Sequence, residues 1–329
     1  MIKAQLSMKR LFLIFYFSGL TFYLPAQTVS QKLQKAFSVF EKDDQLKHAI
    51  SSLHVIDAAT GQVVFSKNSQ VGLAPASTQK IITSVTAFEL LGKDYRYKTE
   101  FGTINNSGKT SLYIKPSGDP TLGSWRWETT KQKNVLSRIA QSFSSTNFTN
   151  AETVVVHAQG WNAEQIPDGW IWQDIGNYYG AGPDVLNWRE NQFDLILKSG
   201  SKIGNPVEVV ETDPVLFSYP ITSYATSAAR GTGDNAFIYQ PSNSDQAYVR
   251  GTIPIRENHF VISGAMANPA NQFIKTIVDS LKDRFKQPKD MGTTFLYNEV
   301  KSNTKIVHTE FSPFLDSIIY WLNKKSVNL

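Results

Sequence analysis

The first strongly apolar segment of the chain is a run of fourteen residues, Leu11 to Leu24, broken only by single small or polar residues. Lys3, Lys9 and Arg10 precede it, and this part of the chain has no acidic residue. A basic start, a short apolar stretch and a small residue near its end are typical of a secretory signal peptide. A retained membrane anchor, the alternative, needs about 20 apolar residues. The pattern predicts a signal peptide at 1–27 and an exported, periplasmic protein without a stable membrane anchor.

The next segments show one helical and two strand-like patterns. Leu33, Phe37 and Phe40 recur at spacings of four and three, as on one face of a helix. Two β-like runs, 52–56 and 62–66, are separated by five residues that end in a glycine, which predicts a hairpin.

A longer helical pattern runs from Ser77 to Leu91 and is followed by Gly92, a common helix end. Its apolar residues share one face and are Ile81, Ile82, Val85, Phe88 and Leu91. We expect this face to be buried. A hairpin followed by a buried helix indicates an α+β fold.

The region from about 101 to 307 has a different pattern. Short β-like runs, such as 112–115, 153–157 and 193–197, alternate with loops rich in Ser, Asn and Gly. Apolar residues spaced four apart predict one helix over 269–285. We interpret the region as mostly β, with room for two subdomains.

Tryptophan is frequent between Trp125 and Trp188. Such residues can line a glycan or peptide groove, but large aromatic side chains usually fill cores. We therefore expect core packing.

A last helix is predicted near the end of the chain. Its apolar residues are Phe314, Leu315, Ile318, Ile319 and Leu322. Ser312 and Pro313 form a cap-and-first-residue signal, so we expect the helix to begin there.

Composition excludes several classes of function. The 329 residues include no cysteine, which excludes a disulfide framework, thiolate metal sites and a thiol nucleophile. The five histidines lack metal-ligand spacing, so no metal or organic cofactor is expected. Three of the 33 basic residues belong to the predicted signal, which leaves 30 basic against 28 acidic side chains. This small excess gives no reason to expect a nucleic-acid partner.

Ser77 and Lys80 are the first candidate for catalytic chemistry. A spacing of three places the hydroxyl and the amine on one face of a helix, about 5–6 Å apart at Cβ. A serine hydroxyl needs an adjacent base to act as a nucleophile, and a desolvated lysine can supply one. The alternative is a surface serine and lysine in the first turn of a helix.

Ser326 and Asn328 form a second candidate, a Ser-x-Asn directly after the last helix. The hydroxyl can relay a proton, and the amide can bond both Lys80 and a substrate amide. The alternative is a frayed polar end of the chain.

Together these residues resemble the serine D-alanyl-D-alanine carboxypeptidase/endopeptidases, the low-molecular-mass class C penicillin-binding proteins. The resemblance covers nearly the whole chain after the signal and rests on five ordered matches. They are Pro75–Lys80 with Leu90–Arg96, Ser117–Leu122, Pro167–Ala181, Leu186-Asn187, and Ser312-Pro313 through Asn328.

The resemblance implies an α+β penicillin-recognising domain, similar to β-lactamases and transpeptidases. It would consist of 28–100 and 308–329, with 101–307 as the large insertion. It also implies that Ser77 attacks the D-Ala-D-Ala carbonyl of a peptidoglycan stem peptide, or a cross-link, and forms an acyl-enzyme. Lys80 would accept the proton, while Ser326 and Asn328 would serve the leaving amine and position the substrate. β-Lactams would be covalent inhibitors.

One departure from the family pattern affects the expected activity. The third family motif, Lys-Thr-Gly on a strand after Ser-x-Asn, is missing, because only Leu329 follows Asn328. Lys198-Ser199-Gly200 has a similar composition but precedes Ser326 and is interpreted as a chance match in a loop. In the family the Lys-Thr-Gly strand supplies one of the two backbone donors of the oxyanion hole. Loss of one such donor lowers the rate of the reaction roughly 10²–10³-fold. We therefore expect the domain to be incomplete, the chain to be C-terminally truncated, and its activity to be impaired.

Two other functions remain open from the sequence. A periplasmic protein that binds peptidoglycan without turnover would keep the inserted region and form no adduct at Ser77. A serine β-lactamase shares the Ser-x-x-Lys chemistry, but the long insertion argues against it.

Overall fold

The computed structural model describes residues 27–106, 108–146, 148, 153–162, 164–217, 219–241, 246–285, 291–299 and 303–328. Apart from Gln27, the predicted signal peptide lies outside the described residues. The chain divides into two compact units, 1–75 and 76–329.

The described residues of the first unit form the predicted helix and the predicted two-stranded hairpin. Its elements are α2 (Val29–Phe40), β1 (Leu53–Ile56) and β2 (Val63–Lys67). A capping box, in which Thr28 and Gln31 bond each other's backbone N–H, begins α2. Phe37 of α2 is buried and packs on Phe65 of the hairpin, with ring centroids 5.9 Å apart. The apolar face of this helix therefore covers one face of the antiparallel pair.

Helix α3 (Gln79–Leu91) opens the second unit and follows a 3₁₀ turn, Ala76–Thr78. It ends at Leu91 as predicted but begins at Gln79 rather than Ser77, and the expected burial of its apolar face is wrong. All five residues of that face are exposed, Ile82 by 68%, and the residue that α3 buries is Ser84. Lys80 and Ser84 lie one turn apart on the side that faces helix α7 (Leu315–Lys325), so the packed side of α3 is its polar one.

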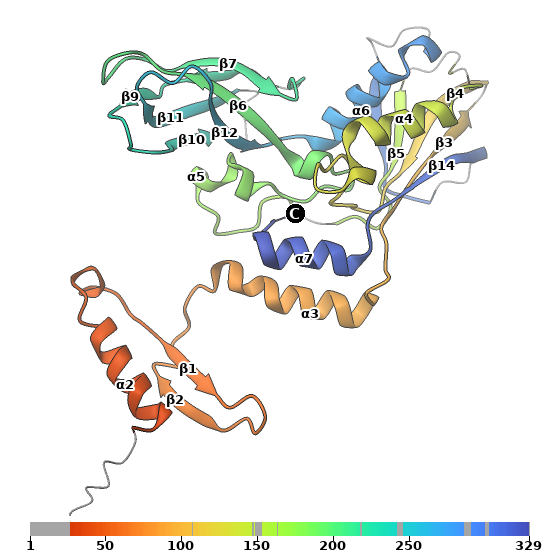
Figure 1. Cartoon of the computed structure of the whole chain (residues 1–329). Coiled ribbons are helices and arrows are strands. Elements are labelled where there is room, and N and C mark those ends of the chain that lie inside the picture. Colours follow the sequence, from red (N-terminus) through yellow and green to blue (C-terminus); the bar gives the residue numbers. More distant parts are fainter. Residues whose placement is uncertain are drawn as a thin grey trace, which may run out of the picture. The chain divides into compact units, whose positions relative to one another are not determined.

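A five-stranded sheet with two helices forms the first core of this unit. Its strands are β3 (Lys98–Asn106), β4 (Lys109–Lys115), β5 (Thr153–His157), β13 (Gly292–Leu296) and β14 (Asn303–Phe311), in the order β13-β5-β4-β3-β14. Figure 1 shows α4 (Gln132–Ser142) and α6 (Pro269–Ser280) lying along this sheet. Alternate sheet residues such as Leu112 and Ile114 are fully buried against Ile139 of α4 and Phe273 of α6. Helix α4 was not predicted from the sequence, and the helix predicted over 269–285 ends at Ser280.

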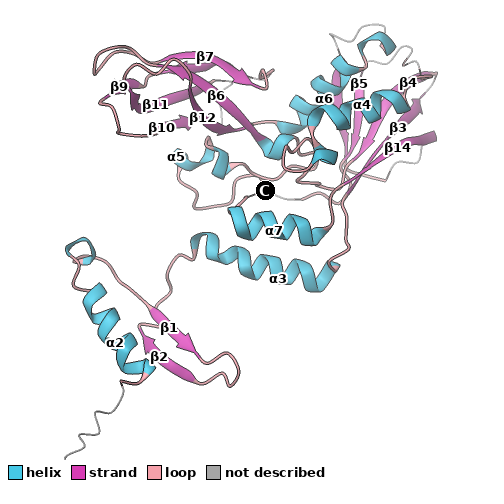
Figure 2. Cartoon of the chain, viewed as in Figure 1, coloured by secondary structure: helices cyan, strands magenta, loops and turns pink. Residues whose placement is uncertain are grey.

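A second core lies between two smaller sheets, which Figure 2 shows as a separate group of strands. One sheet contains β6 (Gln192–Lys198), β7 (Glu208–Asp213) and β12 (Phe260–Ala265), and the other contains β8 (Ile221–Ser223), β9 (Thr226–Ala228), β10 (Asn235–Tyr239) and β11 (Ala247–Pro254). The short helix α5 (Trp172–Ile175) precedes them in the chain. Two separate cores in the middle of the chain agree with its strand-rich pattern.

The extent of the inserted region, 101–307, remains a prediction. Its two predicted boundaries fall inside β3 and β14, which pair with each other in antiparallel register. Both ends of the predicted insertion therefore belong to one continuous sheet.

Helix α7 begins later than expected. Its N-cap is Phe314, whose side chain makes no capping bond, and its first residue is Leu315. The hydroxyl of Ser312 instead accepts the backbone N–H of Tyr97 and donates to the carbonyl of Pro313. Ser312 is fully buried where β14 leaves the sheet, so its hydroxyl serves the neighbouring backbone rather than the helix.

The expectation that tryptophan fills the core holds for Trp188 and in part for Trp161, which is half-buried and packs against the first core. Trp188 is fully buried and lies 4.7 Å from the ring of Phe273. Trp125, Trp170 and Trp172 are exposed. The exposed three lie outside the sheets, on loops and at the start of α5, where the sequence pattern does not show which side faces solvent.

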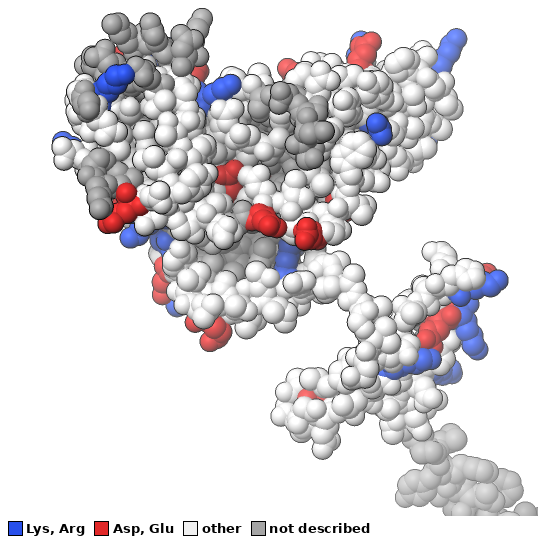
Figure 3. All heavy atoms as spheres, turned by 180° about the vertical axis from the view of Figure 1, so that it is seen from behind, with Lys and Arg blue, Asp and Glu red and all other residues white. Residues whose placement is uncertain are grey.

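Two surface properties bear on function. Among the described residues, no helix is long and apolar enough to cross a membrane. On the larger unit in Figure 3, the visible Lys and Arg side chains are far apart and interleaved with Asp and Glu, whereas on the smaller unit several lie close together beside acidic ones.

Candidate active site

The structure brings together the four residues singled out in the sequence. Ser77 and Lys80 lie nearly 250 positions before Ser326 and Asn328. The Lys80 Nζ lies 3.3 Å from the Ser77 Oγ and 3.0 Å from the Ser326 Oγ. The two serine oxygens are 2.8 Å apart. Lys80 also donates to the Oδ1 of Asn328. One amine therefore contacts two hydroxyls and one amide, all from side chains able to exchange or orient protons.

The turn before α3 presents Ser77. Ala76 has a φ of 45°, a left-handed conformation that costs a non-glycine residue roughly 1–2 kcal/mol. Such strained backbone is concentrated at functional sites. Ser77 follows directly in the 3₁₀ turn, and Lys80 lies in the first turn of α3, so the helix sets the distance between hydroxyl and amine.

The end of α7 supplies the other half of the cluster. Ser326 is the C-cap of this helix and has a left-handed backbone, with a φ of 54°. Its carbonyl accepts a hydrogen bond from Lys80 at 3.0 Å, as cations commonly do at helix C-termini. The same backbone turn directs Ser326 and Asn328 toward Lys80.

The amine of Lys80 is partly removed from solvent. Burial of the amine lowers the pKa of Lys80 below its ordinary value. An ammonium has three N–H donors, yet four acceptors surround this nitrogen, which are the two hydroxyl oxygens, the Ser326 carbonyl and the Asn328 amide oxygen. When the amine is deprotonated, its lone pair can accept the hydroxyl proton of Ser77. The geometry thus suits Lys80 as a general base toward Ser77.

Tyr179 belongs to the site but was not assigned a role from the sequence. The Nδ2 of Asn328 donates to the backbone carbonyl of Tyr179. This bond orients the amide, so that its oxygen faces Lys80. No sequence signal could identify Tyr179, because its contact is made by the backbone.

Three contacts hold α7 in place, and sequence reasoning missed them all. The Trp127 Nε1 donates to the Ser317 Oγ at 2.8 Å, and the Arg126 guanidinium lies 5.1 Å from the Trp321 ring. The Ser84 Oγ of α3 lies 3.2 Å from the Asn323 Oδ1. These residues fix the helix that carries Ser326.

The first turn of α7 is also anchored through its backbone. The N–H groups of Leu315 and Asp316, which have no partner inside the helix, donate to the carbonyls of Tyr95 and Lys93. The loop after α3 therefore ties the start of α7 to the end of α3.

Lys198-Ser199-Gly200 takes a structural role. Lys198 ends β6, and the buried Ser199 donates to the carbonyl of Pro254 at 2.6 Å and accepts the N–H of Glu257. The Ser199 hydroxyl is thus bonded to the backbone of a neighbouring segment. This role is consistent with the interpretation of the tripeptide as a chance match to the family motif. Elsewhere in the described part of the chain, no group of three His, Asp or Glu side chains is placed to hold a metal ion.

Comparison with known proteins adds a family and a fold. The model of the D-Ala-D-Ala carboxypeptidase 3 (S13) family matches residues 33–329. A D-alanyl-D-alanine carboxypeptidase of Actinomadura sp. (strain R39) is 24% identical over 233 residues, 68% of this chain and 41% of that protein. The D-alanyl-D-alanine carboxypeptidase DacB of Haemophilus influenzae is 21% identical over 217 residues, 64% of this chain and 40% of that protein. The chain spans about two fifths of the length of these curated relatives.

Solved structures show the same fold. The crystal structure of penicillin binding protein 4 from Haemophilus influenzae superposes with a TM-score of 0.65 and 18% identity, over 84% of this chain and 59% of that one. The same protein complexed with a novel β-lactam gives a TM-score of 0.57 over 85% of this chain. The predicted α+β fold with a β-rich region is therefore confirmed.

Proposed function

Because the chain belongs to the D-Ala-D-Ala carboxypeptidase 3 (S13) family, we propose that it is built for serine-type cleavage of D-alanyl-D-alanine peptides through an acyl-enzyme on Ser77. The observation that carries the proposal is the contact of Lys80 with both Ser77 and Ser326 at 3.3 and 3.0 Å. A hydroxyl, an adjacent base and a second proton-relaying group are the parts that nucleophilic acyl transfer requires.

The chemistry proceeds in two steps. Lys80 accepts the Ser77 proton as the oxygen attacks the carbonyl between the two alanines. The C–N bond then breaks, and a proton returns through Lys80 or the Ser326 hydroxyl to the leaving amine. Water attacks the resulting ester and releases the shortened peptide. Asn328 orients the substrate amide, and a cross-link between stem peptides can be cleaved by the same steps.

β-Lactams are the proposed covalent inhibitors. Attack by Ser77 opens the lactam C–N bond, and the ring nitrogen takes the proton, so that no group leaves and the ester remains. The complex of a structural neighbour with a β-lactam supports this part of the proposal. We place the protein in the periplasm, on the strength of the predicted signal peptide.

The proposal is tested by the intact mass of the chain after incubation with benzylpenicillin. We expect a gain of one benzylpenicillin in the wild type and none in Ser77→Ala. Thr83→Ala, which removes an exposed hydroxyl from α3, should keep the adduct. A folded wild-type chain without adduct would contradict the proposal and favour peptidoglycan binding without turnover.

The expected impairment of turnover stays a prediction. It is measured separately, as release of D-alanine from a D-Ala-D-Ala peptide by the same chain. Rapid penicillin hydrolysis in place of a lasting adduct would instead favour a β-lactamase.

A further inference from the structure

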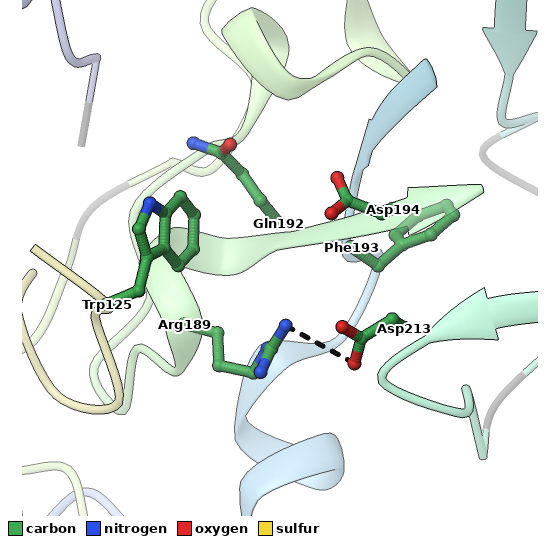
Figure 4. A pocket seen from close by; sticks show the side chains of 6 residues that line it. All are labelled: Trp125, Arg189, Gln192, Phe193, Asp194 and Asp213. Carbon is green, nitrogen blue, oxygen red and sulfur yellow. Dashed lines mark ion pairs between the residues drawn. The ribbon is translucent and has the colours of Figure 1, made fainter. Parts of the chain in front are cut away.

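A pocket of about 330 Å³ lies in the second unit, built from residues to which the proposed reaction assigns no role. Its lining residues are Trp125, Arg189, Gln192, Phe193, Asp194 and Asp213. Figure 4 shows the indole of Trp125 on one side, Gln192, Phe193 and Asp194 along one strand, and Arg189 directed at Asp213. Its volume is at the lower end of the range of small-molecule sites, which suits a ligand of one or two rings.

Two carboxylates face the pocket at a cost to stability. Asp194 of β6 and Asp213 of β7 are direct partners in antiparallel register, where like charges destabilise a sheet. Asp194 accepts the Ser263 hydroxyl at 2.7 Å, and Asp213 lies 3.5 Å from the Arg189 guanidinium. Gln192, two residues before Asp194, shares its face of β6. Two facing carboxylates destabilise this part of the sheet, and such locally unfavourable pairs are typical of binding sites.

Arg189 carries an unused donor. Its side chain is only 18% exposed, and its Nε–H is buried without a partner. Leaving such a donor unpaired costs about 1–3 kcal/mol. Arg189, Glu190 and Asn191 all have left-handed φ values, from 51° to 55°. This unusual turn lets Glu190 bond Arg126 while Arg189 lines the pocket.

The polar groups specify what the ligand must offer. The lining offers a guanidinium, an amide and two carboxylates, so the ligand needs both hydrogen-bond acceptors and donors. It also needs an apolar face for the Trp125 ring, which is 46% exposed. A lysine ammonium only donates and would offer no acceptor to the Gln192 amide N–H or the guanidinium. A phosphate would meet two carboxylates against one guanidinium.

A sugar ring meets all of these needs, because its hydroxyls donate and accept around an apolar face. We propose that this pocket binds a neutral pyranose residue of a glycan, with Trp125 as the stacking platform and Gln192, Asp194, Asp213 and Arg189 as hydrogen-bonding partners. The site is separate from the proposed acylation site.

The test measures binding of tri-N-acetylchitotriose to the whole chain by titration calorimetry. Using the Ser77→Ala background makes the result independent of the acylation proposal. Trp125→Ala, Gln192→Ala and Asp194→Asn should each weaken binding about tenfold or more. Asparagine keeps the oxygen that accepts the Ser263 hydroxyl, so Asp194→Asn is the variant least able to disturb folding. Trp170→Ala is the matched control, since Trp170 is similarly exposed at 40% and lies outside the pocket, and it should bind as the parent does.

Parallel titrations with cellotriose and with a lysine-containing tripeptide distinguish the ligand classes. Binding of the acetamido sugar alone supports a cell-wall-type glycan, and binding of both sugars supports neutral pyranoses in general. The proposal is overturned if neither sugar binds, if the peptide binds in their place, or if Trp170→Ala weakens binding as much as Trp125→Ala.

Discussion

Helix α3 and the five-stranded sheet belong to the same compact unit, but the apolar residues of the sheet are buried and those of α3 are exposed. Phe273, which α6 packs on the sheet, is fully buried between Phe101 and Trp188. Ile82 and Val85 of α3 remain mostly exposed. The sheet is therefore held by apolar burial, whereas the proposed nucleophile and base are held by hydrogen bonds between α3 and α7. Mutations in the two regions should accordingly separate stability from chemistry.

The largest expected effect is on chemistry, from Lys80→Ala. Loss of the proposed base should slow acylation by benzylpenicillin by about 10²–10⁴-fold. The unfolding free energy should change by less than about 1 kcal/mol, because the lysine is only partly buried. Time-resolved intact mass and urea unfolding measure the two quantities. Lys93→Ala, an exposed lysine just after α3, is the control and should acylate normally. An unchanged rate in Lys80→Ala would exclude the assigned role.

The largest effect on stability is expected from Phe273→Ala. Deleting this fully buried ring should lower the unfolding free energy by about 3–5 kcal/mol, from lost burial and the cavity left behind. Urea unfolding of the wild type and the variant measures the difference. A loss below about 1 kcal/mol would mean that the sheet core is not the main source of stability in this unit.

A smaller, pH-dependent effect is expected at Asp119, which lies between β4 and α4. Burial raises the pKa of Asp119 to about 6, partly offset by hydrogen bonds from Thr121, while Glu310 raises it further and Arg96 lowers it. The folded state therefore binds more protons than the unfolded state between about pH 4 and 6. The stability this provides is complete below pH 4 and is lost as the pH rises through 6.

Asp119→Asn should remove that dependence, because asparagine does not titrate. Relative to this variant, the wild type should lose about 3 kcal/mol of unfolding free energy between pH 4 and 7. Chemical unfolding at several pH values tests the sign, and a constant difference between the two proteins would contradict it.

The smallest effect is expected on the exposed face of α3. Ile82→Gln should change the unfolding free energy by no more than about 0.5 kcal/mol, since this side chain is already in water. Urea unfolding, as for Phe273→Ala, measures this difference. A loss above about 1.5 kcal/mol would show that this face is covered in solution, and the contrast between the two regions would then fail.

Local pattern was sufficient for the secondary structure that flanks the proposed site. The spacing of Leu33, Phe37 and Phe40 predicted α2, and the apolar stripe ended by Gly92 predicted α3, because helix periodicity and a glycine stop act over a few residues. Ser77 and Lys80 were found in the same way, since one helical turn sets their separation.

Only the tertiary structure determined which elements contact each other at the proposed site. That Ser326 reaches Lys80 depends on how α7 docks on α3, which Trp127 and Arg126 help to hold through contacts far apart in sequence. The exposure of Ile82 and the burial of Ser84 reversed the expectation from hydrophobicity, because the side of α3 that packs is chosen by its partner helix. Periodicity determines which residues share a face, whereas only the packed structure determines what that face contacts.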